Sequence, residues 1–313
     1  FYGYRNFRIE GENGEIFAEA NSVWVFMDTE KMRPTRVSER MQEVYIPEIK
    51  DEIPGEWADR KISLPDDITS IGKQAFYQCE KLQTITLPSA LTQIGDEAFS
   101  GCLVLDKIKI PSEVTAIGKS AFENCAAAES ISMGNLVDTI GDLAFKGCTK
   151  ASSVKISSAL TEIPKELFAG DTSFTDCKMP NSITAINASA FEGCTGLTTI
   201  TIPSSVTTIE TSAFSGCTGL TELSFKSGVT VIGDSSFQGC TGLKSVTLPS
   251  SVVSIGTSAF SGCTALAEVS IPKATMSIKS AAFSGCTFTT VTINKVCSYQ
   301  SDSFPTGITI ENY

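Results

Sequence analysis

A phenylalanine recurs every 23 residues along most of this chain. The recurring positions are Phe76, Phe99, Phe122, Phe145, Phe168, Phe191, Phe214, Phe237, Phe260 and Phe283. Three residues after each of them stands a cysteine, except after Phe168, where Asp171 takes its place. A unit of this length cannot bury its apolar side alone, so its copies must stack and share a continuous core. We therefore predict a solenoid of about ten coils.

One complete unit is residues 203–225, PSSVTTIETSAFSGCTGLTELSF. Its L-x-x-I-x-I part alternates apolar and polar residues and commonly stops at a proline, which predicts a β-strand. The V-T-x-I part predicts a shorter extended piece, followed by a glycine where a chain reversal with positive φ is easiest. The A-F-x-G-C part predicts one or two helical turns. The expected fold class is α/β, with parallel β-strands and short helical turns.

The repeat divides the chain into two parts. Residues 61–313 are the predicted solenoid, and after Phe283 the next phenylalanine follows only 21 residues later, at Phe304. We expect a shortened coil there that closes the C-terminal end of the core. Residues 1–60 lack the repeat and predict a small β-rich segment with two strands around the turn Glu12-Asn13-Gly14. Because both ends of a solenoid need caps, this segment is a candidate N-terminal cap.

Composition excludes several classes of function. The chain has no histidine, which removes Ser-His-Asp and Cys-His catalytic sets and His-ligated metal sites. The formal net charge of −11 argues against nucleic acid or an anionic membrane as partner. No apolar run is long enough to span a membrane as a helix. We therefore expect no catalytic residues, no cofactor, no metal and no transmembrane segment in this chain.

The 11 cysteines could serve one of three chemical roles, as a disulfide framework, a thiolate metal site or a nucleophile. Equivalent thiols one coil apart fall within disulfide reach, but their Cβ vectors should run parallel. A column does not converge on one metal ion, and a thiol between Phe and Leu positions should be buried and inert. We therefore interpret the cysteines, including Cys177, as core residues, with some disulfide left open and Cys297 as the one that could be exposed.

The pattern I-G-x-x-A-F-x-G-C-x-x-L-x-x-I-x-(I/L)-P, over residues 62–293, resembles the BspA-like leucine-rich repeats. The resemblance implies a leucine-rich-repeat solenoid in a cell-surface or secreted protein that binds a protein partner, such as a host or matrix protein, without enzymatic activity. The asparagine of commoner leucine-rich repeats is absent, and Ala90 and Glu113 are among the residues at its position. A structural spacer between other domains is the alternative.

Residues 5–45 separately resemble a fragment of the acyl-ACP thioesterases. Gly14 to Asp28 match the form G-x-x-x-A-x-A-x-S-x-W-V-x-M-D, and Arg33 to Ser38 match R-P-x-R-V-S. The family's catalytic region, which contains a histidine, is replaced here by repeats. The resemblance implies a remnant or fusion that is catalytically inactive as it stands, an artefact of the sequence, or a hairpin that serves as a cap.

The residues flanking the central Ile of each L-x-x-I-x-I strand should face solvent. Most are Ser or Thr, and the basic ones are Lys107, Lys109, Lys155 and Lys178. Aligned strands would bring these lysines onto one surface, which predicts a site for an acidic partner. The alternative is that the charges only keep a flat sheet soluble, since no exposed aromatic anchor occurs at these positions. A column of threonines beside the second strand is explained by β-propensity and by hydroxyl pairing between coils.

Overall fold

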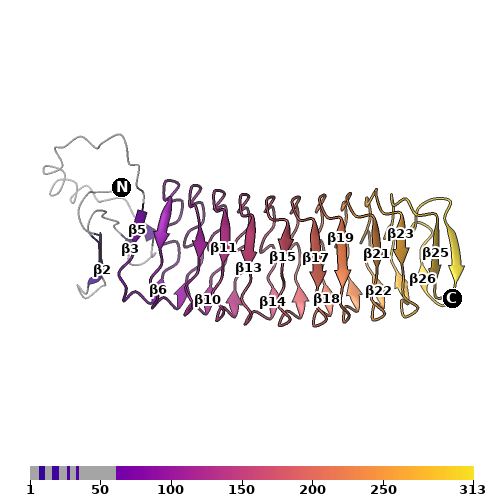
Figure 1. Cartoon of the computed structure of the whole chain (residues 1–313), viewed down its shortest axis with the longest axis horizontal. Coiled ribbons are helices and arrows are strands. Elements are labelled where there is room, and N and C mark those ends of the chain that lie inside the picture. Colours follow the sequence, from indigo (N-terminus) through magenta and orange to yellow (C-terminus); the bar gives the residue numbers. More distant parts are fainter. Residues whose placement is uncertain (1–6, 11–15, 21–26, 29–32, 35–60) are drawn as a thin grey trace.

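The computed structural model of the protein describes residues 7–10, 16–20, 27–28, 33–34 and 61–313. Residues 61–313 form a parallel β-solenoid of about 11 turns (Figure 1). Each regular turn carries two short strands, one from each extended part of the repeat. The prediction of a leucine-rich-repeat solenoid with parallel strands is confirmed.

The L-x-x-I-x-I parts form one series of strands, and their outward surface is called here the odd-strand face. They are β5 (Lys61–Ser63), β7 (Thr84–Thr86), β9 (Ile108–Lys109), β11 (Ser130–Ser132), β13 (Ser153–Lys155), β15 (Asp176–Cys177), β17 (Thr199–Ile202), β19 (Glu222–Phe225), β21 (Ser245–Thr247), β23 (Glu268–Ser270), β25 (Thr290–Ile293) and β27 (Thr309–Asn312). They pair in short groups, β5-β7, β9-β11-β13, β15-β17-β19, β21-β23 and β25-β27.

The V-T-x-I parts form the second series. They are β6 (Ser70–Ile71), β8 (Gln93–Ile94), β10 (Ala116–Ile117), β12 (Thr139–Ile140), β14 (Glu162–Ile163), β16 (Ala185–Ile186), β18 (Thr208–Ile209), β20 (Val231–Ile232), β22 (Ser254–Ile255), β24 (Ser277–Ile278) and β26 (Ser298–Tyr299). Two sheets result, β6 to β12 and β14 to β26. The break between them coincides with Pro164, which stands where most other coils have a glycine such as Gly141 and has no N–H to donate.

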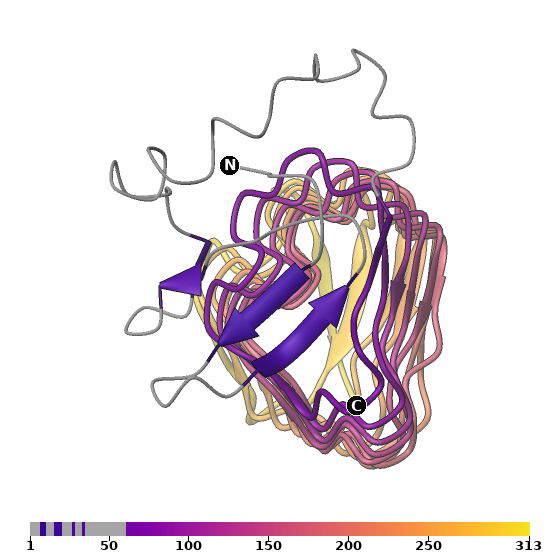
Figure 2. The ribbon, with the colours of Figure 1, turned by 90° about the vertical axis from the view of Figure 1, so that its left-hand side faces the viewer.

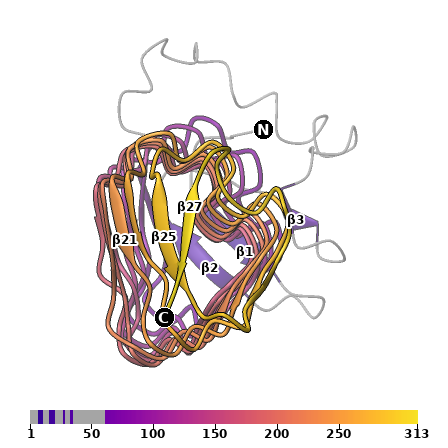
Figure 3. The ribbon, with the colours of Figure 1, turned by 90° about the vertical axis from the view of Figure 1, so that its right-hand side faces the viewer.

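The repeat phenylalanines stack in the core as one column. The rings of Phe191 and Phe214 are 5.0 Å apart at an interplanar angle of 1°. At the C-terminal end, Phe304 continues the column, with its ring 5.7 Å from that of Phe283. Figure 3 shows the strands β25 and β27 of this shortened coil at the end of the stack. Phe304 therefore continues the core into this shortened coil.

The predicted helical turns are wrong, because the described residues contain no helix. The A-F-x-G-C part is a series of turns in which alternate N–H groups bond to the next coil. The Phe99 N–H, for example, donates to the Ala121 oxygen at 2.7 Å. Positive φ at Glu97 (54°) and Gly101 (76°) interrupts any helical path. Bonds between coils therefore replace the bonds that a helix would make within one coil.

The role predicted for the glycine after the second strand is also wrong. The positive φ falls two residues later, as at Ser120 (52°), and Gly118 is not among the residues with positive φ. A Cβ at Gly118 would lie 2.4 Å from the Asp96 nitrogen, so close approach to the preceding coil is what requires glycine there.

In the N-terminal part, β1 (Phe7–Glu10) pairs antiparallel with β2 (Ile16–Ala20), which confirms the predicted hairpin. Figure 2 views the molecule from this end. The strands β3 (Met27–Asp28) and β4 (Arg33–Pro34) form a second antiparallel pair. The turn Glu12-Asn13-Gly14 and most of the thioesterase-like motif lie outside the described residues. Within the described parts, no helix is long and apolar enough to cross a membrane.

Candidate binding site on the odd-strand face

Three of the four predicted lysines share one register position on the odd-strand face. Lys109 is the partner of Ser132, Ser132 is the partner of Lys155, and Lys155 forms a bridge with Lys178. The same position in the following coils is held by Thr201, Ser224, Thr247 and Ser270. All three lysines are exposed. This row, from Lys109 to Ser270, is called here the cationic column, because it contains no acidic residue.

Lys107 lies two residues before Lys109, just ahead of β9, and so belongs to a neighbouring column. That column also holds acidic residues, since Asp176 pairs with Thr199, and Thr199 pairs with Glu222. Glu268, the partner of Ser245, belongs to it as well. The structure therefore gathers Lys109, Lys155 and Lys178 in one column and places Lys107 in the next column, where Asp176 lies beside Lys178.

Within residues 61–313 no lysine of the cationic column forms an ion pair. The salt bridges there involve other lysines, Lys146 and Lys165 with Glu166 at 2.6 Å and 3.6 Å, and Lys279 with Asp234 at 3.4 Å. Lys155 and Lys178 stand on adjacent rungs, an arrangement in which like charges destabilise a sheet. An acidic group bound along the column would relieve that repulsion.

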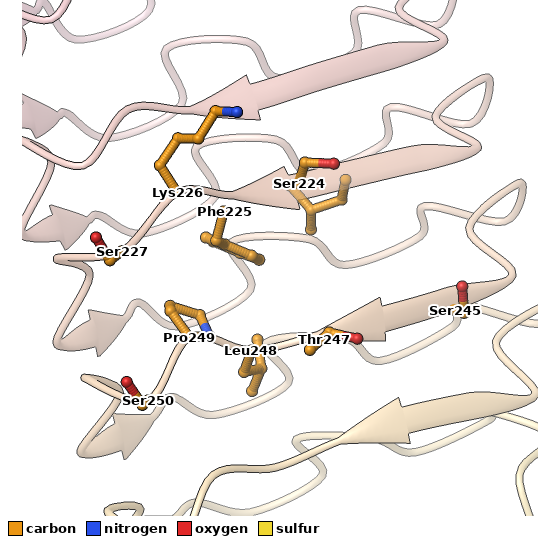
Figure 4. Close-up of a pocket in the computed structure, with 10 residues that line it drawn as sticks. Ser224, Phe225, Lys226, Ser227, Ser245, Thr247, Leu248, Pro249 and Ser250 are labelled. Carbon is orange, nitrogen blue, oxygen red and sulfur yellow. The ribbon is translucent and has the colours of Figure 1, made fainter.

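A groove of about 350 Å³ lies farther along the same face, between β19 and β21 (Figure 4). Its lining comes from two coils: Leu223, Ser224, Phe225, Lys226 and Ser227, then Ser245, Thr247, Leu248, Pro249 and Ser250. Leu223 and Leu248 are buried at its base, and Phe225 is half-buried. Lys226 is the one charged residue of this lining. The groove combines an apolar base, hydroxyl groups and one ammonium group.

The groove opens because β19 and β21 pair away from each other, β19 with β17 and β21 with β23. Lys226 stands where adjacent coils have proline, and its N–H donates to the Ile202 oxygen at 3.0 Å. Proline cannot make this bond. Gly228 has φ 112°, and a Cβ there would lie 2.1 Å from the Ser204 oxygen. Lys226 is therefore bonded to the preceding coil, on the side of β19 that faces away from the groove.

Sequence reasoning missed this groove because Phe225 occupies an inward position of the repeat. The signal was a local departure from the pattern, since residues 225–228, FKSG, stand where residues 202–205 are IPSS. Phe225 replaces an isoleucine that is fully buried in the preceding coil, Ile202. Its larger ring reaches the surface and also makes an edge contact with Phe237, at a centroid distance of 6.5 Å.

The cysteines are core residues, as predicted. Ten of the 11 are buried free thiols, among them Cys177. The expectation that Cys297 could be exposed is wrong, because it is 7% exposed, and Cys79 in the first coil is the one of intermediate exposure. Burial raises the pKa of the Cys177 thiol to about 12, with a further contribution from the charge of Asp176. No group of three or more Cys, Asp or Glu suited to a metal ion occurs within the described residues.

Asp171 is the exception in the cysteine column. Its side chain is fully buried, and neither carboxyl oxygen has a hydrogen-bond partner. Burial raises the pKa of Asp171 well above its usual value. The N–H groups of Cys148 and Gly147 oppose this shift, but both already donate to main-chain carbonyls. Burial therefore favours the neutral form of this carboxyl group.

The threonine column forms bonds of a different kind from those expected. The hydroxyl groups donate to main-chain oxygens of the preceding coil, as Thr92 does to Thr69 at 2.9 Å and Thr184 to Thr161 at 3.0 Å. The hydroxyls therefore couple successive coils through the backbone, not through one another.

Two family models match different parts of the chain. The family model described as BspA type leucine-rich repeat region matches residues 58–175, 161–289 and 231–310. The model of the acyl-ACP thioesterase N-terminal domain matches residues 1–45. A comparison with curated proteins finds no match.

Solved structures share the fold. A leucine-rich cell surface protein from Faecalibacterium prausnitzii is 27% identical, with a TM-score of 0.55 over 80% of this chain and 79% of that one. A leucine-rich repeat protein from T. pallidum is 26% identical, with a TM-score of 0.50 over 58% of this chain and 83% of its own. The pneumococcal vaccine antigen PcpA is 20% identical, with a TM-score of 0.51 over 81% and 74%, a likeness of fold alone. With repeats matched from residue 58 to residue 310, the chain belongs to the BspA-type leucine-rich repeat family.

Proposed function

We propose that this is a non-enzymatic binding protein of the cell surface or the secreted fraction, whose odd-strand face receives an acidic segment of a protein partner, such as a host or matrix protein. The observation that carries the proposal is the cationic column, in which Lys109, Lys155 and Lys178 are exposed and form no ion pair within residues 61–313. The cell-surface relative from F. prausnitzii supports the location. Lys107 would contribute from the neighbouring column.

Charge complementarity explains why the partner should be acidic. Lys109 lies two coils from Lys155, and Lys155 lies one coil from Lys178, so successive lysines are about 5–10 Å apart at the spacing of paired strands. This separation is at or below the Debye length of about 8 Å to 10 Å at moderate salt, so the charges act together on one ligand. The protein's net charge of −11 keeps other surfaces from attracting the same ligand.

The test is binding of a labelled hexaglutamate peptide, measured by fluorescence anisotropy at low salt. Replacing Lys109, Lys155 and Lys178 by Gln should weaken binding by at least fivefold. The matched control replaces Lys119, Lys150 and Lys295, which are exposed and lie outside the strands, and should change affinity by less than twofold. Equal weakening by both triple variants would contradict the proposal, because it would show that only the overall charge matters.

A second candidate function follows from the match of residues 1–45 to the acyl-ACP thioesterase N-terminal domain. The chain has no histidine, so any contribution of this segment would be binding of an acyl carrier without hydrolysis. Hydrolysis of an acyl-carrier thioester by the whole chain would contradict the non-enzymatic proposal, and acyl-carrier binding that is lost on deletion of residues 1–45 would favour the second candidate.

A further inference from the structure

We infer that the groove between β19 and β21 is an anchor site for an apolar side chain, next to a carboxylate, in the same acidic polypeptide that the cationic column receives. The inference rests on the proposed function and adds the apolar contact that the lysines alone cannot provide. Its walls and base are Phe225, Leu223, Leu248 and Pro249, and its charge is the ammonium group of Lys226.

The groove has the composition of a binding hot spot. Aromatic side chains at the centre of an interface contribute most of the binding energy when they enter a desolvated contact. Phe225 is half-buried, so its ring is already ordered by the contact with Phe237 and loses little entropy on binding. The buried Leu223 and Leu248 below it extend the apolar surface that a bound side chain would cover.

The charges of the groove select an acidic ligand. Lys226 is exposed and is the one charged group among the lining residues. The rim is otherwise made of hydroxyl groups, on Ser224, Ser227, Ser245, Thr247 and Ser250, which can donate hydrogen bonds to a carboxylate or to a peptide carbonyl. A carboxylate near Lys226 would therefore find both an opposite charge and donors.

The groove continues the cationic column. Ser224 and Thr247, which line it, occupy the register position of Lys109, Lys155 and Lys178. Ser224 lies two coils beyond Lys178, about 10 Å at the spacing of paired strands. An extended peptide covers that distance in about three residues. One acidic segment can therefore reach the lysines and place an apolar side chain in the groove.

This spacing defines the probe peptides. The first is the labelled hexapeptide Glu-Glu-Glu-Ser-Ser-Leu with a free C-terminal carboxylate, and the second carries Ser in place of its Leu. Affinities are measured by fluorescence anisotropy on the whole chain. The first peptide should bind at least fivefold more tightly than the second, because only its Leu side chain can enter the groove.

The decisive variant is Phe225→Ile, since Ile is the residue at the equivalent position of the preceding coil and should leave the fold intact. This variant should weaken binding of the Leu peptide by about fivefold and leave the affinity for the Ser peptide unchanged. Lys226→Gln should weaken both peptides, by about threefold, through loss of the ammonium group. The triple lysine variant of the cationic column should also weaken binding of both peptides. Thermal melting of each variant checks that the solenoid is intact.

The outcomes separate the two proposals. If Phe225→Ile leaves the Leu peptide unchanged while the triple lysine variant weakens it, the groove inference is overturned and the proposed function stands. If neither peptide binds, both are overturned. If soluble polyglucuronic acid binds in a manner that depends on Phe225 and neither peptide does, the groove belongs to an acidic sugar and the polypeptide assignment is wrong.

Discussion

The Sγ atom of Cys217 lies 3.1 Å from the main-chain oxygen of Phe191 in the preceding coil. The same thiol-to-carbonyl contact recurs along the column, from Cys102 to Cys286, at 3.1–3.5 Å. Cysteine is small enough for the interior of the coil and still offers a weak donor. Each repeat cysteine from Cys102 to Cys286 therefore fills space in its own coil and bonds to the coil before it.

The first prediction concerns thiol reactivity. In the native protein the thiols of Cys125 and Cys177 should react with iodoacetamide at least 100-fold more slowly than a free thiol, because burial raises their pKa and blocks access. Cys79, which is half-buried, should be labelled first. Peptide mass spectrometry with and without denaturant measures this. Rapid native labelling of Cys125 would contradict the interpretation of the cysteines as core.

The fold was largely predictable, because the 23-residue spacing of residues such as Phe191 and Phe214 determines stacking whatever the details of each coil. The turns were not predictable. A short A-F-x-G-C segment can form hydrogen bonds within its own coil or to the next coil, and the position of the neighbouring backbone decides between the two. Ser120 is an example, because bonds between coils impose its positive φ and serine is not a residue type that predicts this conformation.

The candidate site was also predictable only in part. Lys109, Lys155 and Lys178 could be placed on one surface from strand periodicity alone. The groove could not be predicted from the sequence, because it depends on which strands pair. Phe225 also occupies a position of the repeat that normally holds a core residue. Its neighbours Lys226 and Gly228 differ from the repeat pattern, but this difference in sequence does not predict whether a groove forms between the coils.

The second prediction concerns pH. The folded state holds the Asp171 proton more tightly than the unfolded state, because burial raises its folded pKa. The stabilising contribution is therefore fully present below the unfolded pKa of about 3.9. As pH rises above that value the unfolded state ionises first, and the free energy of unfolding falls by up to about 1.4 kcal/mol per pH unit. The fall ends at the folded pKa.

The measurement is urea unfolding of wild type and Asp171→Asn from pH 4 upward. The difference between the two free energies of unfolding should change with pH in the direction just given, because asparagine does not titrate. Asp171→Cys, which restores the residue of the column, should stabilise the protein at pH 7 by about 2 kcal/mol or more, since it removes a buried carboxyl group without partners. Parallel pH profiles for wild type and Asp171→Asn would show that this group does not titrate between the two states.

The third prediction concerns the break in the second sheet at Pro164. Gly118 donates its N–H to the Ile94 oxygen at 2.8 Å, and Gly141 makes the same bond to Ile117, whereas proline cannot. Since repeat arrays are coupled through neighbours, the sheets β6 to β12 and β14 to β26 should exchange amide hydrogens as two units.

Pro164→Gly restores the missing donor. Amides of residues 139–140 and 162–163 should then exchange about fivefold more slowly, the effect of one hydrogen bond of about 1 kcal/mol. Hydrogen exchange with mass spectrometry resolves these peptides, and peptides around residues 254–255 serve as the internal reference. Identical exchange of both sheets already in the wild type would contradict the prediction.

The last prediction tests the strain stored in the turns. Ala281 has φ 52°, a region that costs an L-residue about 1 kcal/mol or more, whereas its neighbour Ala282 is not among the residues with positive φ and is fully buried. Ala281→Gly should therefore raise the free energy of unfolding by about 0.5–1 kcal/mol. Ala282→Gly, which removes the same methyl group one residue later, should lower it by about 1 kcal/mol through lost packing and added chain entropy. Urea unfolding compares the pair directly. If both substitutions destabilise the protein equally, the positive φ at Ala281 carries no strain, and the solenoid tolerates these turns without cost.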